Sequence, residues 1–368
     1  MAVHEVRVDL SRPLTSDPGS GHNRWHPDVP PAVSCEPGDE VVLTTRDALD
    51  GRLGPDATPA DLAKIDLGVV HPLTGPVHVA GAEPGDILVV DILEVVPGAY
   101  GYTVQLPGFG FLREHFPDPF LAMWQFEDGF ATSAAIPGVR VPGAPFMGIL
   151  GVAPSQGLMV EIKSRESDLA GRGGMALLPD PAGAVPANPV IARTGLRTVP
   201  PRENGGNLDI RALTAGTRVY LPVWAPGALF SAGDAHFAQG DGEACGTAIE
   251  MAATLRVRLD VRKGQASVRG TRDVAFVRTK DAPAAAPGPY YATTGICVGR
   301  DGRNLAEDVT LAARNALLNM IDYLGFEYGY SRQQAYAICS VAVDVKVAQL
   351  VDVPNVLVTA TLPLDIFG

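Results

Sequence analysis

Apolar and polar residues alternate over several stretches of this chain, and the alternation predicts β-strands. From Leu255 to Val261, apolar side chains take every second position, with arginine or aspartate between them. Successive side chains of a strand point to opposite faces of a sheet, so this pattern predicts a half-exposed strand. Val6, Val8 and Leu10 alternate with polar residues in the same way, which predicts a short strand near the N-terminus.

Turns rich in proline and glycine precede apolar runs at residues 36–43 and 83–90, and residues 214–221 form a looser third copy. Each predicts a turn that leads into a strand, the kind of unit that builds β-sandwiches and barrels. The copies are irregularly spaced, which argues against a solenoid repeat. Residues 100–150 are rich in proline, glycine and aromatic residues. They predict a long loop region around a pocket or subunit contact, or else a second core cluster. Residues 165–205 are also predicted to be loops.

The last third of the chain has a helical pattern instead. Apolar residues recur at helical spacing from Leu305 to Leu324, and Gly325 is a stop signal. Ser331 and Gln334 have the spacing of a capping box, which predicts the start of a second helix. Residues 356–364 predict a closing strand. The chain is therefore expected to be mainly β, with an α+β region after about residue 265.

Composition supports large cores and long ordered loops. Apolar residues make up 46% of the 368 residues, and glycine (41) and proline (32) together reach about a fifth of the chain. We divide the chain into an N-terminal β-rich region (1–165), a central β region that carries a Gly-Asp-x-His motif (166–264) and a C-terminal α+β region (265–368).

Charge and targeting signals narrow the class of protein. The net charge of −12 argues against nucleic acid or an anionic membrane as a partner. The N-terminus lacks a basic-then-apolar signal, and no apolar run is long enough to span a membrane. The four cysteines are scattered without a Cys-x-x-Cys pair. We therefore expect a reduced, cytoplasmic protein.

The most informative segment is Gly233-Asp-Ala-His-Phe-Ala-Gln-Gly-Asp-Gly-Glu243. In a strand, Asp234 and His236 point the same way, and a carboxylate beside an imidazole suits a divalent metal or a general base. The glycines allow sharp turns and close approach to a ligand. The alternative is a polar hairpin rim with Asp241-Gly242 as its turn.

Four further segments concentrate polar residues: 22–26, 46–51, 71–76 and 203–209. Taken singly, each resembles an ordinary turn. Taken together, Asp47, Asp209 and His236 form a mixed carboxylate and imidazole set of the kind that holds zinc with an open coordination position. His71 is an additional candidate ligand, although a histidine before proline is often only the start of an extended loop.

Cysteine and serine nucleophiles are weighed against this metal site. Cys245 follows Glu243 closely, but neighbouring carboxylates raise a thiol pKa rather than lower it, so a buried structural role is favoured. The chain lacks the Gly-x-Ser-x-Gly elbow of serine hydrolases and the glycine-rich loops of nucleotide-binding proteins.

The chain resembles the acetamidase/formamidase family over nearly its whole length. The matching segments are His22-Asn-Arg-Trp-His-Pro-Asp28, Arg46-Asp-Ala-Leu-Asp-Gly51, His71-Pro-Leu-Thr-Gly-Pro76, Gly81-Ala-Glu-Pro-Gly-Asp86, Gly148-Ile-Leu-Gly-Val-Ala-Pro154, Asn204-Gly-Gly-Asn-Leu-Asp209, residues 233–243 and Gln349-Leu-Val-Asp-Val-Pro354. The resemblance implies a jelly-roll-like β-sandwich with a smaller β-barrel part and an α+β region. It also implies a homo-oligomer (dimer or higher) that hydrolyses short aliphatic amides such as formamide and acetamide. One departure is Arg52, where relatives often carry glutamine. If that glutamine contacts the substrate amide, Arg52 alters the pocket; the alternatives are that Arg52 accepts an acidic substrate group or is simply exposed on the surface.

The resulting hypothesis is a metal-dependent amidohydrolase. Its divalent ion, expected to be zinc with calcium as the alternative, is held by Asp47, His71, Asp209 and His236. Glu243 or Asp234 moves the proton of the attacking water, and Asn207 or Gln239 binds the amide. The alternatives are a Cys245-dependent amidase and a non-catalytic or other-substrate member of the same fold.

Overall fold

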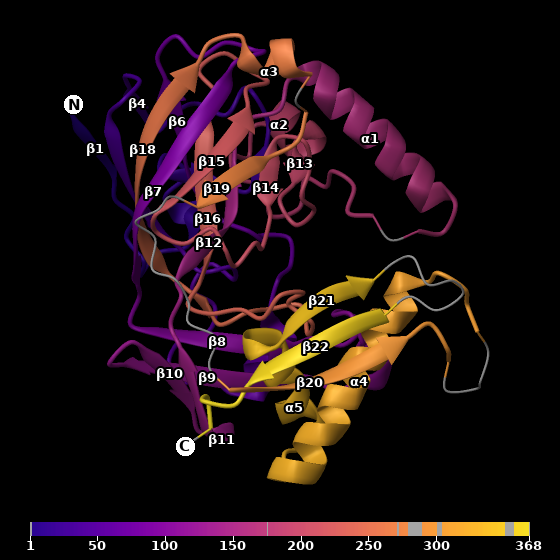
Figure 1. Ribbon diagram of the computed structural model, residues 1–368. Coiled ribbons are helices and arrows are strands. Elements are labelled where there is room, and N and C mark those ends of the chain that lie inside the picture. The colour runs from indigo at the N-terminus through magenta and orange to yellow at the C-terminus, as the bar shows by residue number, and fades with distance from the viewer. Residues whose placement is uncertain are drawn as a thin grey trace.

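The computed structural model describes residues 2–174, 176–270, 272–278, 289–299, 304–349 and 357–367. The molecule is mainly β, as the sequence predicts. Two large sheets form most of it, and the C-terminal region lies against one end of this β body (Figure 1). Within the described residues no sheet closes into a barrel, so the smaller closed barrel was a wrong expectation.

The first sheet has six strands and joins distant parts of the chain. Apart from the parallel pair β1 and β5, neighbouring strands run antiparallel. The strands in order are β1 (Val3–Val6), β5 (Glu40–Thr45), β18 (Ala253–Arg262), β7 (Ile87–Pro97), β15 (Thr217–Pro222) and β19 (Ala275–Arg278). The sheet draws strands from all three predicted regions, whose boundaries stay a prediction.

The second sheet has eleven strands and carries the polar segments of interest. Its main path is β11 (Ile136–Pro142), β10 (Phe130–Ser133), β9 (Phe120–Glu127), β8 (Tyr100–Gln105), β17 (Glu250–Met251), β16 (Phe230–His236), β12 (Phe146–Gly151) and β14 (Gly205–Asn207). Off this path, β6 (Leu73–Val79) pairs with β16, β2 (Gly21–His22) and β4 (Val33–Cys35). Strand β16 therefore lies inside the sheet.

The C-terminal region is α+β, as predicted. A three-stranded sheet, β20 (Tyr290–Ile296), β22 (Leu357–Pro363) and β21 (Asp344–Gln349), packs against helix α4 (Val309–Tyr328), which is followed by α5 (Arg332–Ala342). Ser331 caps α5 in the predicted capping box with Gln334. Helix α4 passes through Gly325 and ends at Gly329, whose φ of 74° only glycine adopts easily. The prediction of Gly325 as the stop was therefore wrong.

Shorter elements complete the fold. The pair β3 (Arg24–Trp25) and β13 (Leu196–Arg197) forms a separate two-stranded sheet. The remaining helices are α1 (Gln156–Gly171), α2 (Pro189–Thr194) and α3 (Gln265–Arg269), and the 3-10 helices are η1 (Leu14–Ser16), η2 (Pro59–Lys64) and η3 (Arg113–His115). No described helix has the length and apolar character needed to cross a membrane.

Three local predictions differ from the structure. Residues 100–150 form strands β8 to β12 rather than a long loop. Helix α1 reaches into residues 165–205, where only loops were expected, and the N-terminal strand is Val3–Val6 rather than residues 6–10. Proline and glycine lie in the turns between short strands here, and a high local content of both hides the strands. The segment from 350 to 354 lies outside the described residues.

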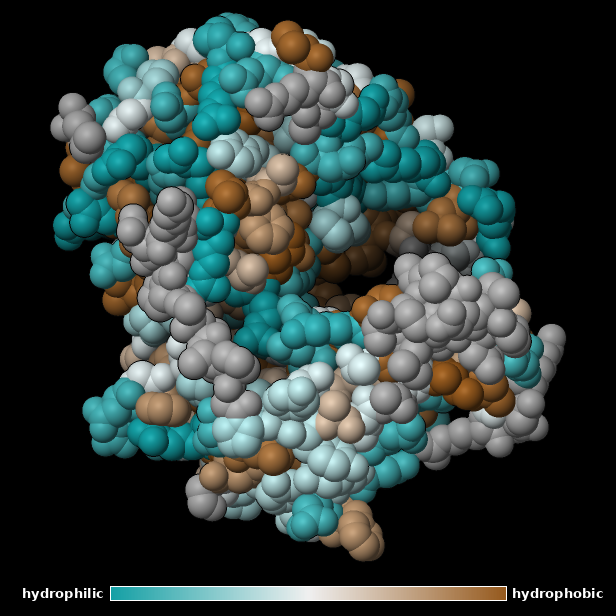
Figure 2. Space-filling model, viewed as in Figure 1, coloured by the Kyte–Doolittle hydropathy of each residue, from teal (hydrophilic) through white to brown (hydrophobic). Residues whose placement is uncertain are grey.

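One continuous hydrophobic core runs through the two large sheets and the C-terminal helices. It includes side chains of β16 and of α5, such as Ala235 and Ile338, which have no exposed surface. Figure 2 shows a hollow between the part of the molecule that carries α1 and the C-terminal part, with hydrophobic residues visible inside it.

Candidate active site

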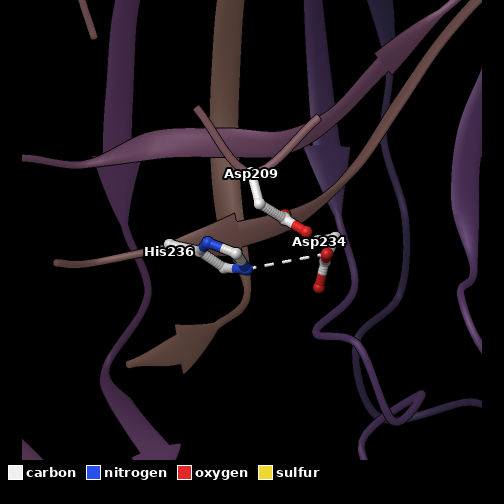
Figure 3. Close-up of side chains that lie close together, drawn as sticks. All are labelled: Asp209, Asp234 and His236. Atoms are coloured by element: carbon white, nitrogen blue, oxygen red, sulfur yellow. Dashed lines mark ion pairs between the residues drawn. The ribbon is translucent and has the colours of Figure 1, made fainter. Parts of the chain in front are cut away.

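Strand β16 brings two of the predicted residues to the interior of the eleven-stranded sheet. Asp234 and His236 are 3% and 0% exposed, and β16 is flanked there by β12, β6 and β17. Asp209 follows β14, which pairs with the opposite edge of β12. In Figure 3 the side chains of Asp209, Asp234 and His236 point toward one another.

The polar side-chain atoms around His236 lie close enough to one another to bind the same metal ion. His236 Nε2 lies 3.5 Å from Asp234 Oδ2 and 3.2 Å from Glu250 Oε2. Donor atoms of Asp209, Asp234 and His236 all lie within 4.8 Å of one another, as do those of His236, Glu243 and Glu250. Zinc bonds of about 2.0–2.2 Å put tetrahedral ligand atoms roughly 3.3–3.6 Å apart. The spacing therefore suits one small cation.

Three of the acidic residues have a left-handed backbone conformation, which residues other than glycine rarely adopt. The φ angles of Asp209, Asp234 and Glu243 are 47°, 56° and 42°. A positive φ costs free energy for residues other than glycine and persists where the surrounding structure enforces it. Asp234 interrupts the regular alternation of β16 in this way, yet its carboxylate still reaches His236.

The residues present fit a metal ion. Asp209 Oδ1, Asp234 Oδ1 and His236 Nε2 are buried and make no well-directed hydrogen bond with any described residue. Such buried polar atoms are rare and point to a missing partner. A Cβ on Gly148 would lie 2.6 Å from Asp209 Oδ1 and 2.9 Å from Asp234 Oδ2. The glycine therefore leaves a space between the two carboxylates that any other side chain would fill.

Charge in the cluster is unbalanced without a cation. Burial raises the pKa of both Glu243 and Glu250 to about 8. Burial, with Glu243 close by, also raises the pKa of Asp209 well above its ordinary value. Burial opposes the imidazolium form of His236, but Glu250 and Asp234 outweigh it and raise the pKa of His236. Two buried acidic residues, Asp234 and Glu250, and two half-buried ones, Asp209 and Glu243, thus surround His236 and are suited to bind a divalent cation.

His71 lies at the edge of this cluster, at the start of β6. Its Nε2 is 3.9 Å from Asp234 Oδ2, and its Nδ1 is buried without a hydrogen-bond partner among the described residues. The backbone N–H of His71 donates to Thr198 Oγ1 at 2.5 Å, which fixes the main chain. Long-range contacts thus bring His71 beside Asp234, although it belongs to neither group of converging donor atoms among the described residues, so its role as a ligand stays a prediction.

Asp47 has a different environment. One of its oxygens accepts hydrogen bonds from the Leu49 N–H (2.9 Å) and the Tyr102 hydroxyl (2.7 Å), and the other accepts from the Gly51 N–H (2.9 Å). Asp47 belongs to neither group of converging donor atoms found among the described residues. The structure therefore shows Asp47 closing a turn, with its lone pairs already engaged.

The two predicted amide-binding residues also differ. Gln239 Oε1 lies 2.9 Å from His236 Nδ1, and its Nε2 donates to the Asp209 carbonyl at 2.7 Å, so both ends of the side chain are occupied. Asn207 Nδ2 donates to Asp209 Oδ2 at 2.8 Å, while its Oδ1 is buried without a partner in the described structure. Asn207 therefore offers a free acceptor beside the cluster.

Sequence reasoning missed Glu250 and Gly148. Glu250 pairs directly with His236 across β16 and β17 and is 2% exposed. A single carboxylate within the apolar run from Ala248 to Ala253 is the signal that identifies it. Gly148 lies in the quoted segment 148–154, but only the spatial neighbours of its Cα show its importance.

Cys245 is an unfavourable nucleophile. It is 1% exposed, and burial raises its thiol pKa to about 11. Its Sγ lies near the carbonyl oxygens of Val104 and Thr247 rather than near a base. A thiol in this environment stays protonated at neutral pH.

Comparison with known proteins identifies the family of this chain. The model of the Acetamidase/Formamidase family matches residues 7–368. The formamidase of Methylophilus methylotrophus is 38% identical over 98% of this chain and 93% of its own length. The acetamidase of Mycolicibacterium smegmatis is 38% identical over 90% of this chain and 87% of its own.

A solved structure is also similar to this chain in both sequence and fold. The gamma lactamase from Delftia acidovorans has 38% sequence identity and a TM-score of 0.94, covering 99% of this chain and 93% of that one. The fold and the predicted family are thereby confirmed. The chain belongs to the acetamidase/formamidase family and is an amide-hydrolysing enzyme.

Proposed function

We propose that this enzyme hydrolyses short aliphatic amides with a divalent metal ion, zinc in the first place, held by Asp209, Asp234 and His236. The proposal differs from the sequence hypothesis in replacing Asp47 by Asp234. The observation that carries it is the convergence of these three donor atoms within 4.8 Å of one another, with Gly148 leaving space beside the two carboxylates. When bound there, the ion polarises the amide carbonyl and makes water more acidic.

The side chains around the three ligands have separate tasks. Asn207 Oδ1, buried and without a partner in the described part of the chain, accepts an N–H of the substrate amide. Glu243, whose pKa burial raises to about 8, in its ionised form takes a proton from the attacking water and passes it to the departing nitrogen, so that ammonia leaves rather than amide anion. Glu250 lies 3.2 Å from the same Nε2 of His236 and adds a further carboxyl group beside the ion. His71 is a further candidate ligand through its contact with Asp234.

The test is metal removal and restoration. Protein dialysed against a chelator is expected to lose ammonia release from formamide and acetamide, and zinc, calcium or another divalent ion added back singly identifies the metal that restores it. Full activity in protein shown by elemental analysis to hold less than a few per cent of any metal contradicts the mechanism. The family assignment is independent of this result.

A cyclic amide is a second candidate substrate. The high structural similarity to the gamma lactamase from Delftia acidovorans, with a TM-score of 0.94, favours it. We propose that the same site opens a five-membered lactam, with the amino group staying attached to the product. Chromatographic detection of the amino acid product tests this, since ammonia release does not report ring opening.

We also propose a homo-oligomer in the cytoplasm. Exposed apolar side chains support self-association, among them Val268 at 87% and Phe326 at 89%. The four cysteines are buried and form no disulfide, which suits a reducing compartment. Light scattering on the purified protein and fractionation of the cells that contain it test the two statements, and a monomer or an exported protein contradicts them.

A further inference from the structure

We propose that Gln239 is a positioning residue that fixes the hydrogen on His236 Nδ1 and holds the Asp209 main chain, so that both side chains present lone pairs to the same ion. The inference deepens the proposed function and rests on it. It assigns Gln239 a role other than the substrate binding expected from the sequence.

The hydrogen-bond donors and acceptors allow only one arrangement. The Asp209 carbonyl oxygen can only accept, so the Gln239 atom 2.7 Å from it must be the amide nitrogen. The other end of the amide is then oxygen, which can also only accept, and it lies 2.9 Å from His236 Nδ1. Nδ1 therefore carries a hydrogen. In the neutral imidazole this leaves the lone pair on Nε2, the atom that faces Asp234 and Glu250.

The backbone next to Gln239 is held in place by the end of helix α5. The residue is 4% exposed. Its neighbour Gly240 donates its N–H to the Ser340 carbonyl at 2.8 Å, and a Cβ on Gly240 would lie 2.2 Å from the Val343 carbonyl. The end of α5 thus packs directly on the backbone that carries Gln239. This contact connects the α+β region to the site.

One amide consequently links two ligands from separate segments. Asp209 has a left-handed backbone, with φ of 47°, that needs support, and Gln239 supplies a hydrogen bond to its carbonyl. The His236 ring is also held edge-on by Phe146, with ring centroids 5.0 Å apart. Both polar ends of Gln239 already have a protein partner in these contacts, so Asn207 Oδ1, which has none among the described residues, is the better group to bind an amide substrate.

The experiment measures zinc affinity in variants of the full chain. Leucine is similar in size to glutamine, and residue 239 lines a cavity of about 60 Å³, so Gln239→Leu changes the polarity of the side chain more than its volume. In this variant we expect zinc to bind 10- to 100-fold more weakly, as for other outer-shell partners of a metal-bound histidine. Gln239→Glu keeps an acceptor for Nδ1–H, so it is expected to recover part of the affinity. Gln105→Leu is the matched control, a glutamine 2% exposed that bonds to Gln333 instead.

Equal zinc affinity in Gln239→Leu and Gln105→Leu overturns the inference. Absence of zinc binding in the unaltered protein overturns the proposed metal site instead, so the two failures are distinct. Nitrogen-15 NMR of zinc-loaded, histidine-labelled unaltered protein adds a test that needs no variant. The His236 signal, assigned by its loss in His236→Asn, is expected to show hydrogen on Nδ1 and none on Nε2. Hydrogen on Nε2 contradicts the inference even if the Gln239 variants fail to fold.

Discussion

Two aspartates in similar sequence contexts, Asp47 and Asp234, have different roles in the structure. Both lie in segments shared with the family. Burial raises the pKa of Asp47, whereas burial of Asp234 is outweighed by His71 and His236, which lower its pKa. Asp47 accepts hydrogen bonds from two backbone N–H groups and the Tyr102 hydroxyl. Asp234 has a buried oxygen without a hydrogen-bond partner in the described structure and two histidines nearby.

The comparison shows that burial alone does not identify a site. A buried carboxylate whose lone pairs are satisfied by neighbouring N–H and O–H groups stabilises the local fold. A buried carboxylate that is left unsatisfied, on strained backbone and among other acids, is prepared for a ligand. The following predictions test this distinction, from the largest expected effect to the smallest.

Removal of a proposed ligand is expected to have the largest effect. In His236→Ala we expect kcat/KM for acetamide to fall by at least about 10³-fold, since several kcal/mol of transition-state stabilisation depend on the ion. Zinc content, measured by elemental analysis, is expected to fall with it. Activity within tenfold of the unaltered enzyme would remove His236 from the ligand set.

Gly148→Ala is expected to block the space between Asp209 and Asp234. The added Cβ would lie 2.6 Å from Asp209 Oδ1, so the carboxylates have to move apart and zinc affinity is expected to drop about 100-fold. The control is Gly157→Ala in α1, where the new methyl group meets only Ser155 Oγ at 3.9 Å. Calorimetric titration measures both, and the same affinity in the two variants contradicts the proposed location of the ion.

Asp47→Ala is expected to affect stability rather than chemistry. It leaves buried N–H and O–H groups without an acceptor, which costs about 2–4 kcal/mol in the free energy of unfolding. Urea denaturation measures this loss. Zinc affinity is expected to stay within about threefold of the original. A loss of zinc binding in a folded Asp47→Ala protein would restore Asp47 as a ligand.

The metal-free protein is expected to become less stable as pH rises from about 5 to 8. The pKa of both Glu243 and Glu250 in the fold is about 8, above the ordinary 4.5. The folded state therefore binds more protons than the unfolded state between these values. Stability then falls with rising pH, by up to about 1.4 kcal/mol per pH unit for each group. The raised pKa of His236 acts in the same direction.

Thermal melting at a series of pH values measures this dependence. Saturating zinc is expected to flatten it, because the cation replaces the protons. Glu243→Gln is expected to reduce the slope in the metal-free protein. A melting temperature that rises from pH 5 to 8 without metal would contradict the inferred charge state of the cluster.

The smallest effect is expected for Cys245→Ser. The buried thiol is protonated at neutral pH, since its pKa is about 11, so kcat/KM is expected to change by less than about threefold. Cys35 is also a buried thiol and is distant from Cys245 in the sequence. The variant Cys35→Ser therefore serves as a control for the cost of placing a hydroxyl group in the core. Loss of activity in Cys245→Ser alone would favour the thiol mechanism.

Much of the fold can be predicted from local patterns. Alternation from Leu255 to Val261 lies within β18, and the capping box at Ser331 starts α5. These features depend on residues that are neighbours in sequence. The spacing of apolar residues and the capping of a helix end can therefore be recognised without knowing the tertiary structure. Strands β8 to β12 were missed because the turns between them make the whole segment rich in proline and glycine.

The site was predictable only in part, for the same reason. Asp234 and His236 are two residues apart, so one strand carries both. Glu250 joins them through the pairing of β17 with β16, and Asp209 through the pairing of β14 with β12. No local pattern specifies such pairing, because register is set by the packing of whole sheets. Gly148 shows its importance only through what a Cβ would meet.

The sequence by itself determined the mainly β class, the family and the acidic, histidine-containing segment from Gly233 to Glu243. Only the tertiary structure decided which buried aspartate is free to bind an ion. Asp47 and Asp234 have equally suitable carboxylates, and the difference is whether neighbouring N–H and O–H groups already satisfy their oxygens. Those neighbours are assembled by contacts between distant segments, so hydrogen-bond satisfaction is a property of the folded chain.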